Sequence, residues 1–581
     1  MDSTTTMAGV TRGPDVAGKP WRLAMMCEAA AMPLTVFTAR MIRTMDPSLP
    51  TANAIAVRDG RIVEVGTIES LQPWLRHHEH VIDDRFADSV LLPGFIDPHV
   101  HPAMMSLLLA AHWITPEPWD LPGRDIPATE GRDAYLARLS ELIAADGSGA
   151  EGDAASEPFV TYGYHAQFHG EISRSDLDAI TTDRPLIVWQ RSFHELWVNT
   201  PALAWLDAEE GAAWDPHVDL AAGRLFESGM VWGLRTLGPY LLGDGKLDRG
   251  LDDCATLVRA GGVTTIADAG YGIFDFDMEL ASFREHFGSD ESPFRLYLMP
   301  NVLSAKGKLK GGGDLFDQLD AFRSYETERM QFLHAAKFLA DGAFIAQLMQ
   351  MGPPGYIDGH EGAWLSDPEQ LYLLIKPFWD ANFDINIHAN GDQGVTACLD
   401  TIDRLLRETP RFDHRTTLHH FGVSTQAQVR RLAALGVAVQ ANGYYLHLFG
   451  DAFVDRWLGT ERASQMTRLG SVAREGASVA VHSDLPMGPV APLLAASAIA
   501  TRATRNGTTM APTEALSVED ALRAITIEAA WQLRLDHEVG SLAAGKLADL
   551  VVLADDPFTT DPIDWPAIEI EATVVGGRVY P

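Results

Sequence analysis

The chain has 581 residues, more than one ordinary hydrophobic core accommodates, so a large domain with a smaller companion is expected. Its formal net charge of −34 argues against nucleic acid and anionic membrane surfaces as partners. Three scattered cysteines exclude a disulfide framework, and no run of about 18 apolar residues predicts a membrane span, so a protein of the reducing cytoplasm is expected.

Both ends of the chain predict β-strands. Residues 1–33 are small, polar and irregular, and we expect them to form a loose N-terminal extension. Between residues 34 and 90, two short strands flank an Asp59-Gly60 turn, which is a strong hairpin signal. Residues 538–581 contain a second strand–turn–strand pattern. The sequence therefore predicts one small β-sandwich composed of residues 34–90 and 538–581.

The middle of the chain, residues 91–537, alternates short apolar strands with helical stretches. A first buried strand is predicted at residues 90–96. The others are predicted at residues 261–270, 294–301, 335–342, 384–391, 415–422, 436–442 and 476–484. Eight strands with helices between them indicate an α/β fold, the (β/α)8 TIM barrel.

One connection is much longer than the rest. The residues between His101 and Gly261 far exceed the length of a simple βα loop. We therefore predict an inserted subdomain at about residues 113–255. Because it follows the carboxyl end of the first barrel strand, it should lie over the mouth of the barrel, where active sites of this fold form.

Six polar side chains fall at the carboxyl ends of predicted strands. His99 and His101 are spaced i, i+2, which puts both imidazoles on one side of an extended strand. Each of the six has an ordinary structural explanation, such as a hydrogen-bonded histidine or a helix N-cap. Their joint occurrence on five strands favours a site for divalent metal. The predicted ligands are His99, His101, Lys337, His388, His420 and Asp484.

Lys337 has a specific expected chemistry. The sequence contains only eight lysines, and this one lies in an apolar strand, where desolvation favours the neutral amine. A neutral amine can react with carbon dioxide to give a carbamate, whose oxygens can bridge two metal ions.

From residue 34 to residue 580 the chain resembles the amidohydrolase superfamily, and within it the YtcJ-like branch that includes N-substituted formamide deformylases. The matching blocks include LLPGFIDPHVHP (91–102), GVTTIADAG (262–270), KFLADG (337–342), IHANGDQGV (387–395), HSDLP (482–486) and GSLAAGKLADLVVL (540–553). The resemblance implies a distorted barrel beside a composite β-sandwich, and a homodimer. It also implies two divalent cations, with Zn²⁺ expected, and N6-carboxylysine at Lys337.

The chain departs from the family pattern at three positions. His419 stands where the family has glutamate, so either His419 or His420 is the ligand. Strand alternation should point the two in opposite directions, and we favour His420. Ala441 replaces a proline, and His482 replaces a glycine before Ser483-Asp484. His482 either orients Asp484 or packs as a strand residue.

The predicted ligands imply hydrolysis of a non-peptide C–N bond, in an amide, formamide or carbamate, by a metal-bound hydroxide. Asp484 would accept the proton of that hydroxide and pass it to the leaving nitrogen. In the insertion, His194 is the best candidate to contact the carbonyl of a small-molecule substrate, or it is a structural loop residue. Aromatic and methionine side chains are expected to line the pocket, although they are equally good core formers: Trp113, Tyr164, Trp197, Met349 and Met351.

The sequence leaves two alternative functions open. The same scaffold supports ester or lactone hydrolysis, deamination or decarboxylation, because a fold does not fix a substrate. A mononuclear deaminase would not need Lys337. A non-catalytic interaction protein is the more remote alternative, since such proteins lose metal ligands and this sequence retains all six.

Overall fold

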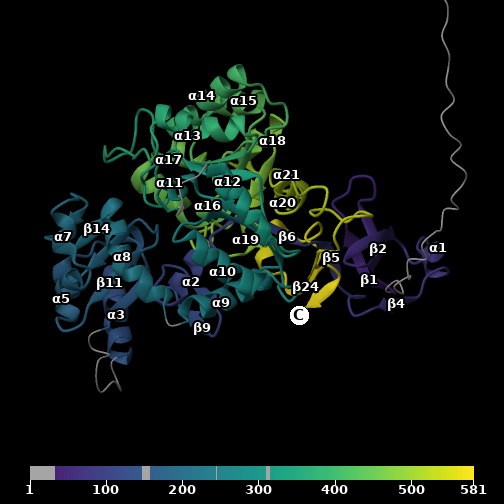
Figure 1. Cartoon of the computed structure of the whole chain (residues 1–581), viewed down its shortest axis with the longest axis horizontal. Helices are drawn as coiled ribbons and strands as arrows, with labels where there is room; N and C mark the ends of the chain where they lie inside the picture. The colour runs from purple at the N-terminus through teal and green to yellow at the C-terminus, as the bar shows by residue number, and fades with distance from the viewer. Residues whose placement is uncertain (1–32, 147–156, 244, 309–314) are drawn as a thin grey trace, which may run out of the picture.

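The computed structural model describes residues 33–146, 157–243, 245–308 and 315–581. The expected N-terminal extension, residues 1–33, lies outside the described residues except for its last one. Figure 1 shows three regions side by side, with a sheet from the two chain ends at one side, the predicted insertion at the other, and the barrel between them. Within the described ranges, no helix combines the length and apolar character that a bilayer span requires.

Both chain ends contribute to one eight-stranded sheet with the order β25-β24-β23-β5-β1-β2-β3, with β4 beside β1. The junction is the antiparallel pairing of β5 with β23. At the Asp59-Gly60 turn both residues have positive φ, 51° and 75°, as a two-residue hairpin requires. The predicted two-layer sandwich remains a prediction. The strands are β1 (Leu34–Arg43), β2 (Thr51–Arg58), β3 (Arg61–Gly66), β4 (His80–Asp83), β5 (Val90–Pro93), β23 (Leu550–Leu553), β24 (Ile570–Val575) and β25 (Arg578–Tyr580).

All eight predicted barrel strands overlap parallel strands of the structure. They form two sheets, β17-β16-β15-β6 and β18-β19-β20-β21-β22. A parallel bridge from Asn301 to Lys337 joins the sheets on one side. On the other side, Asp484 donates its backbone N–H to the carbonyl of His99 at 3.0 Å. The strands are β6 (Phe95–Val100), β15 (Val263–Tyr271), β16 (Arg295–Pro300), β17 (Met330–Phe332), β18 (Ala335–Leu339), β19 (Asp384–Ala389), β20 (Thr417–His420), β21 (Ala438–Ala441) and β22 (Val479–Val481).

The predicted first strand, residues 90–96, is two strands rather than one. β5 belongs to the terminal sheet and β6 to the barrel, and Gly94 lies between them. A Cβ atom at Gly94 would lie 2.0 Å from Oγ1 of Thr264, so only glycine fits where the chain passes from one sheet to the other. The apolar run predicted burial correctly, but it carried no sign of this break.

Helices cover the outside of the barrel and alternate with its strands (Figure 1). Several bury one face only; α14, for example, buries Val395, Leu399, Ile402 and Leu405. The principal helices are α2 (Pro102–Leu109), α9 (Lys246–Ala260), α10 (Phe276–Phe287), α13 (Pro368–Asp380), α14 (Asp392–Glu408), α15 (Gln426–Ala434), α16 (Gly443–Ala452), α18 (Leu469–Arg474), α19 (Pro492–Thr501), α20 (Val518–Ala524) and α21 (Ile527–Gln532).

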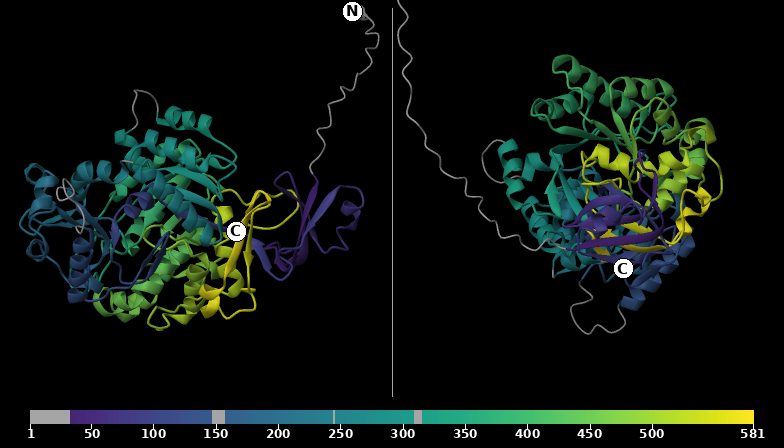
Figure 2. Two further views of the ribbon diagram at one scale, coloured as in Figure 1. Left: turned by 90° about the horizontal axis from the view of Figure 1, so that it is seen from below. Right: turned by 90° about the vertical axis from the view of Figure 1, so that its right-hand side faces the viewer.

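The predicted insertion forms a six-stranded sheet of its own, with the order β13-β14-β12-β11-β10-β7. Figure 2 shows it at the end of the molecule opposite the terminal sheet. Its end near residue 255 needs correction, because α9 packs on α2 and leads directly into β15. The strands are β7 (His112–Trp113), β10 (Phe159–Tyr164), β11 (Leu186–Gln190), β12 (Glu195–Val198), β13 (Val218–Asp219) and β14 (Arg224–Phe226), and the helix α8 (Ser228–Leu242) follows them.

A buried polar cluster fastens the insertion to the barrel. The guanidinium of Arg191 is fully buried, pairs with Glu117, and donates to the carbonyl of Met487 at 3.1 Å. The hydroxyl of Tyr162 donates to the carbonyl of Arg191 at 3.1 Å. Because Met487 lies in the loop that follows Asp484, the insertion holds this loop in place.

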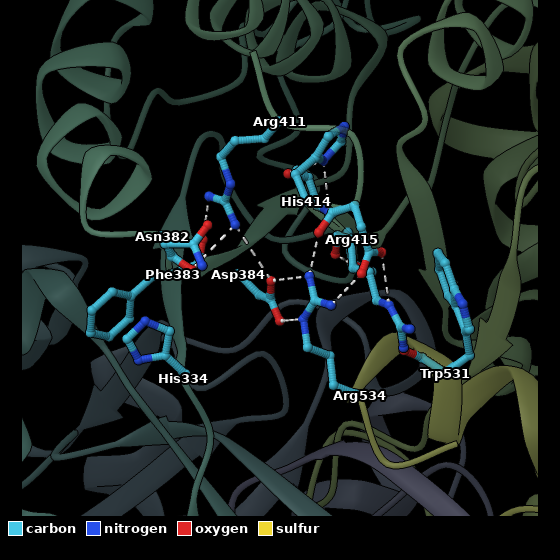
Figure 3. A network of polar contacts seen from close by, with 12 residues as sticks. His334, Asn382, Phe383, Asp384, Arg411, His414, Arg415, Trp531 and Arg534 are labelled. Atoms are coloured by element: carbon cyan, nitrogen blue, oxygen red, sulfur yellow. Dashed lines mark hydrogen bonds and ion pairs between the residues drawn. The ribbon is translucent and has the colours of Figure 1, made fainter. Parts of the chain in front are cut away.

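A second polar network ties the C-terminal helices to the amino-terminal face of the barrel (Figure 3). Asp384, at the start of β19, accepts hydrogen bonds from Nε and Nη2 of Arg534 at 2.5 and 2.9 Å. Arg411 lies 3.8 Å from the same carboxylate. Nη1 of Arg415 donates a hydrogen bond to the carbonyl of Trp531 at 2.5 Å. On barrels of this kind, polar residues at this face serve stability rather than chemistry.

We expect Asp384→Ala to lower the free energy of unfolding by about 2–3 kcal/mol, because it leaves a mostly buried Arg411 without its carboxylate. The loss is smaller than for a fully buried pair, since the Arg534 side chain is 36% exposed. Urea denaturation would measure it. Asp413→Ala is the matched control, because Asp413 also bonds Arg534 but its side chain is 62% exposed. Equal losses of unfolding free energy in the two variants would show that burial of the Asp384 ion pairs does not set their contribution.

Candidate metal centre

A cavity of about 1250 Å³ opens at the carboxyl ends of the barrel strands. The structure brings all six residues predicted as metal ligands to its wall. His99 is the second-last residue of β6, and His101 follows that strand directly. The other four come from four further strand ends, as the sequence argument requires: Lys337 in β18, His388 in β19, His420 at the end of β20, and Asp484 after β22.

Three of these residues present their ligand atoms as a tight triangle. Nε2 of His99 and Nε2 of His101 lie 3.2 Å apart. Oδ1 of Asp484 lies 3.3 Å from each of these two nitrogens. Ligands about 2.0–2.1 Å from one tetrahedral ion are separated by about 3.3 Å, so this set fits a zinc-like cation.

The remaining three predicted ligands lie around the same point. The rings of His388 and His420 are 4.4 Å apart, centre to centre. Nδ1 of His420 is buried and has no hydrogen-bond partner among the described residues, as expected of a nitrogen that binds a metal ion. Burial lowers the pKa of Lys337 to about 7, so its neutral amine is accessible near neutral pH.

The histidines of the cluster are held in their neutral, metal-binding form. Burial lowers the pKa of His388 to about 3, and it lowers the pKa values of His99 and His420 well below their usual range. His101 differs. Burial alone would lower its pKa, but hydrogen bonds to Asp268 and Asp484 raise it to about 9. A cation at the triangle would take the place of the proton on His101.

The expectation that His419 and His420 point in opposite directions is wrong. His420 has a φ of 71°, in the left-handed region, so the chain leaves the strand there and alternation ends. His420 lines the cavity. His419 also turns inward but stays behind the ligands, with Nδ1 2.6 Å from Nζ of Lys337 and 2.9 Å from Nδ1 of His99.

His482 lies beside the cluster rather than in the cavity wall. Its ring stacks on that of His99 with centres 4.6 Å apart. Neither of its ring nitrogens has a hydrogen-bond partner within the described part of the chain. Nitrogens of His99, His420 and His482 lie within 4.8 Å of one another, which is a second group of metal-binding type.

Two residues that contact the ligands were missed at the sequence level. Asp268, in β15, is buried, with Oδ1 3.6 Å from Nδ1 of His101. Tyr445, in α16, lines the cavity and donates its hydroxyl to Oδ2 of Asp484 at 2.6 Å. For Tyr445 a signal existed: it is three residues beyond Asn442, which follows the seventh strand and caps α16.

We expect Tyr445→Phe to lower kcat about tenfold with KM and metal content unchanged, because it frees one carboxylate oxygen of Asp484. A hydrogen bond to a charged group contributes about 1.5–3 kcal/mol, and 1.4 kcal/mol is a factor of ten in rate. Steady-state kinetics with metal analysis checks this. Tyr164→Phe is the control, since its hydroxyl donates to the carbonyl of Gly170 at 2.8 Å, away from the ligands. A kcat loss shared by both variants would show a general packing effect.

His194, in the insertion, lies on the cavity wall as predicted. The other predicted substrate contacts do not. Nδ1 of His194 lies 3.2 Å from Oε2 of Glu227, which also lines the cavity. The structure corrects the expectation for the aromatic and methionine residues. Trp113, Tyr164 and Met349 are buried in hydrophobic cores, and Trp197 and Met351 pack against such cores. None of the five lines the cavity.

The rest of the cavity wall is mainly apolar. Most of it comes from helix α8, from α10 and the loop before it, and from the loop after β18. Its apolar members include Phe193, Met230, Val231, Leu234, Leu242, Ile273, Phe274, Met278, Phe344, Ile345 and Met487. A cavity with one polar end and a large apolar wall fits a substrate whose reactive group is attached to a sizeable apolar body.

The parallel barrel, with histidine and carboxylate groups at its strand ends, has the architecture of the metal-dependent TIM-barrel hydrolases. Residues 87–581 match the model of the Amidohydrolase family, and the chain belongs to that family. It is 25% identical to the putative amidohydrolase YtcJ of Bacillus subtilis, over 93% of this chain and 97% of that protein. It is 23% identical to N-substituted formamide deformylase of Arthrobacter pascens, over 92% and 96%.

Solved structures show the same fold. An uncharacterized metal-dependent hydrolase from Pyrococcus horikoshii superimposes with a TM-score of 0.68 at 18% identity, over 91% of this chain and 99% of that one. A corresponding protein from Pyrococcus furiosus gives a TM-score of 0.66, also at 18% identity, over 90% and 100%.

Proposed function

We propose that this protein hydrolyses a non-peptide C–N bond of a small amide, formamide or carbamate, with two divalent metal ions as cofactors. The observation that carries the proposal is the triangle of His99, His101 and Asp484, whose atom spacing fits one cation. His388 and His420 would hold a second ion. Lys337, as N6-carboxylysine, would bridge the two, and Zn²⁺ is the ion we expect.

The chain's own residues account for the bridging group. The buried amine of Lys337 would attack carbon dioxide, lose one proton and become a carbamate with two anionic oxygen ligands. Its pKa of about 7 makes the nucleophilic amine available at neutral pH. The other carboxylates on the cavity wall have structural partners: Glu227 pairs with His194, and Asp275 caps α10. The carbamate would therefore add negative charge beside Asp484 and offset the charge of two cations.

When bound, the metal pair would lower the pKa of water and polarise the substrate carbonyl. Asp484 would accept a proton on its carboxylate, which Tyr445 holds through a hydrogen bond to Oδ2. It would then pass the proton to the leaving nitrogen, which departs as an amine. His194, held through Nδ1 by Glu227, has its other ring nitrogen for a contact with the substrate carbonyl.

The apolar wall supports a bulky apolar group on the substrate. Side chains of Met230, Leu234 and Phe274 line the same cavity as the ligands. Each methylene that enters such a wall contributes about 0.8 kcal/mol, so a benzyl group should be preferred strongly over a methyl group. The relative from Arthrobacter pascens, by its name, acts on N-substituted formamides, which agrees with this class.

The test is amine release from a matched panel of N-methyl and N-benzyl formamides, acetamides and carbamates, with zinc-loaded and chelator-treated protein. We expect release only from the loaded protein, with kcat/KM at least about tenfold higher for the benzyl compounds. Cleavage of matched esters with no cleavage of any C–N compound would overturn the proposed reaction.

A further inference from the structure

His419 is a fully buried side chain that contacts two predicted metal ligands from behind. Its Nδ1 lies 2.9 Å from Nδ1 of His99 and 2.6 Å from Nζ of Lys337. It does not line the cavity, so it cannot meet the substrate. Its effect must pass through these ligands.

The proton positions on His419 follow from its third contact. Nε2 of His419 lies 3.0 Å from Oδ1 of Asn386, on the neighbouring strand β19. The amide oxygen can only accept, so Nε2 carries the proton. A neutral imidazole carries one proton, which leaves Nδ1 of His419 as a pure acceptor.

The same logic fixes the proton on His99. Since Nδ1 of His419 accepts, Nδ1 of His99 must donate, and Nε2 of His99 is left with a free lone pair. Nε2 is the atom that faces His101 and Asp484 in the triangle. A chain of hydrogen bonds from Asn386 through His419 therefore sets the tautomer of His99 that a metal ion needs.

We propose that His419 is a positioning residue: its Nδ1 accepts from Nδ1 of His99 and so fixes the tautomer of His99, and Nζ of Lys337 lies 2.6 Å from the same nitrogen. Carboxylation of Lys337 leaves one N–H on its nitrogen, so this contact survives the modification. His419 thereby links the ligands of the two proposed metal positions. The proposal rests on the proposed metal-dependent function but concerns a residue outside the cavity.

The opposite orientation of Asn386 gives the opposite prediction. If the amide donated to Nε2 of His419, Nδ1 would carry the proton and donate to His99. Nε2 of His99 would then be protonated and could not bind metal. Asn386→Asp removes the donor and keeps the acceptor, whereas Asn386→Leu removes both. The two variants thus separate the two orientations.

The experiment measures zinc affinity of the full-length protein by competition with a chromophoric chelator, independently of turnover. Loss of an outer contact to a ligating histidine typically costs 10–100-fold in metal affinity. We expect Asn386→Leu and His419→Leu to weaken binding by about that factor, while Asn386→Asp stays within about threefold of wild type. His419→Gln, which offers an acceptor oxygen, should restore part of the loss.

His414→Leu is the matched control. His414 is also buried and lies just before the same strand, but it bonds Oγ1 of Thr416 and the carbonyl of Leu435, away from the ligands. Its zinc affinity should equal that of wild type. Equal weakening in Asn386→Asp and Asn386→Leu, or unchanged affinity in His419→Leu, would overturn the proposal. Wild-type protein that binds no zinc would instead refute the proposed function itself.

Discussion

Asp484→Asn is expected to keep both metal ions and to lower kcat by about 10³-fold, within the range that positioned acid–base groups supply. The amide has the shape of the carboxylate, and its oxygen can still face His99 and His101, each 3.3 Å from Oδ1 of Asp484. It cannot accept the proton that the reaction requires. Metal analysis and steady-state kinetics on the same preparation measure both quantities.

The control for this variant is Asp341→Asn. Asp341 is also a fully buried carboxylate, and it accepts backbone N–H bonds from Asn390 and Gly391, each at 2.8 Å. It does not line the cavity, so its loss should cost stability while kcat stays within about tenfold. If Asp484→Asn keeps a kcat within tenfold of wild type, Asp484 is not the proton-transfer group.

Lys337→Ala is expected to lose the second metal ion and nearly all turnover. The variant removes the only group proposed to bridge the two ions, and loss of a ligand should exceed the 10–100-fold effect of losing an outer contact. Side-chain truncation also leaves space at a site that is 2% exposed, so acetate or propionate should bind there and restore part of the activity. Zinc content and turnover with and without added carboxylate measure this.

Lys376→Ala serves as the control for Lys337→Ala, because the Lys376 ammonium lies on the surface of α13 and pairs with Asp380. It should match wild type in zinc content and rate. Two tightly bound zinc ions in Lys337→Ala would contradict the bridging role, although a site with the three atoms of the triangle could still hold one.

The sequence predicted the parts of the site that depend on strand ends. Apolar runs located eight of the nine strands described in the two barrel sheets and missed the short β17. Because the carboxyl ends of parallel strands meet at one face, His388 and Asp484 came together although they are far apart in sequence. Boundaries were less predictable. At Gly94 the chain changes sheets because of close contact with Thr264, which no local pattern reveals.

What the sequence could not predict depends on three-dimensional context. The left-handed backbone at His420 ends strand alternation, so His420 faces the cavity although the preceding His419 also contacts the ligands. Aromatic side chains fill cores and pockets equally well, so Tyr164 could not be assigned to either from its type. Tyr445 approaches from a helix, where only the fold shows that its hydroxyl meets Asp484.

The most direct test of the central claim is amine release from an N-benzylformamide-type substrate as zinc is added back to metal-free protein. We expect a rate that rises with bound zinc and stops rising at two ions per chain, since the histidine, carboxylate and lysine ligands are shared between two proposed positions. Amine release that is independent of bound zinc, or none at two ions per chain, would contradict it.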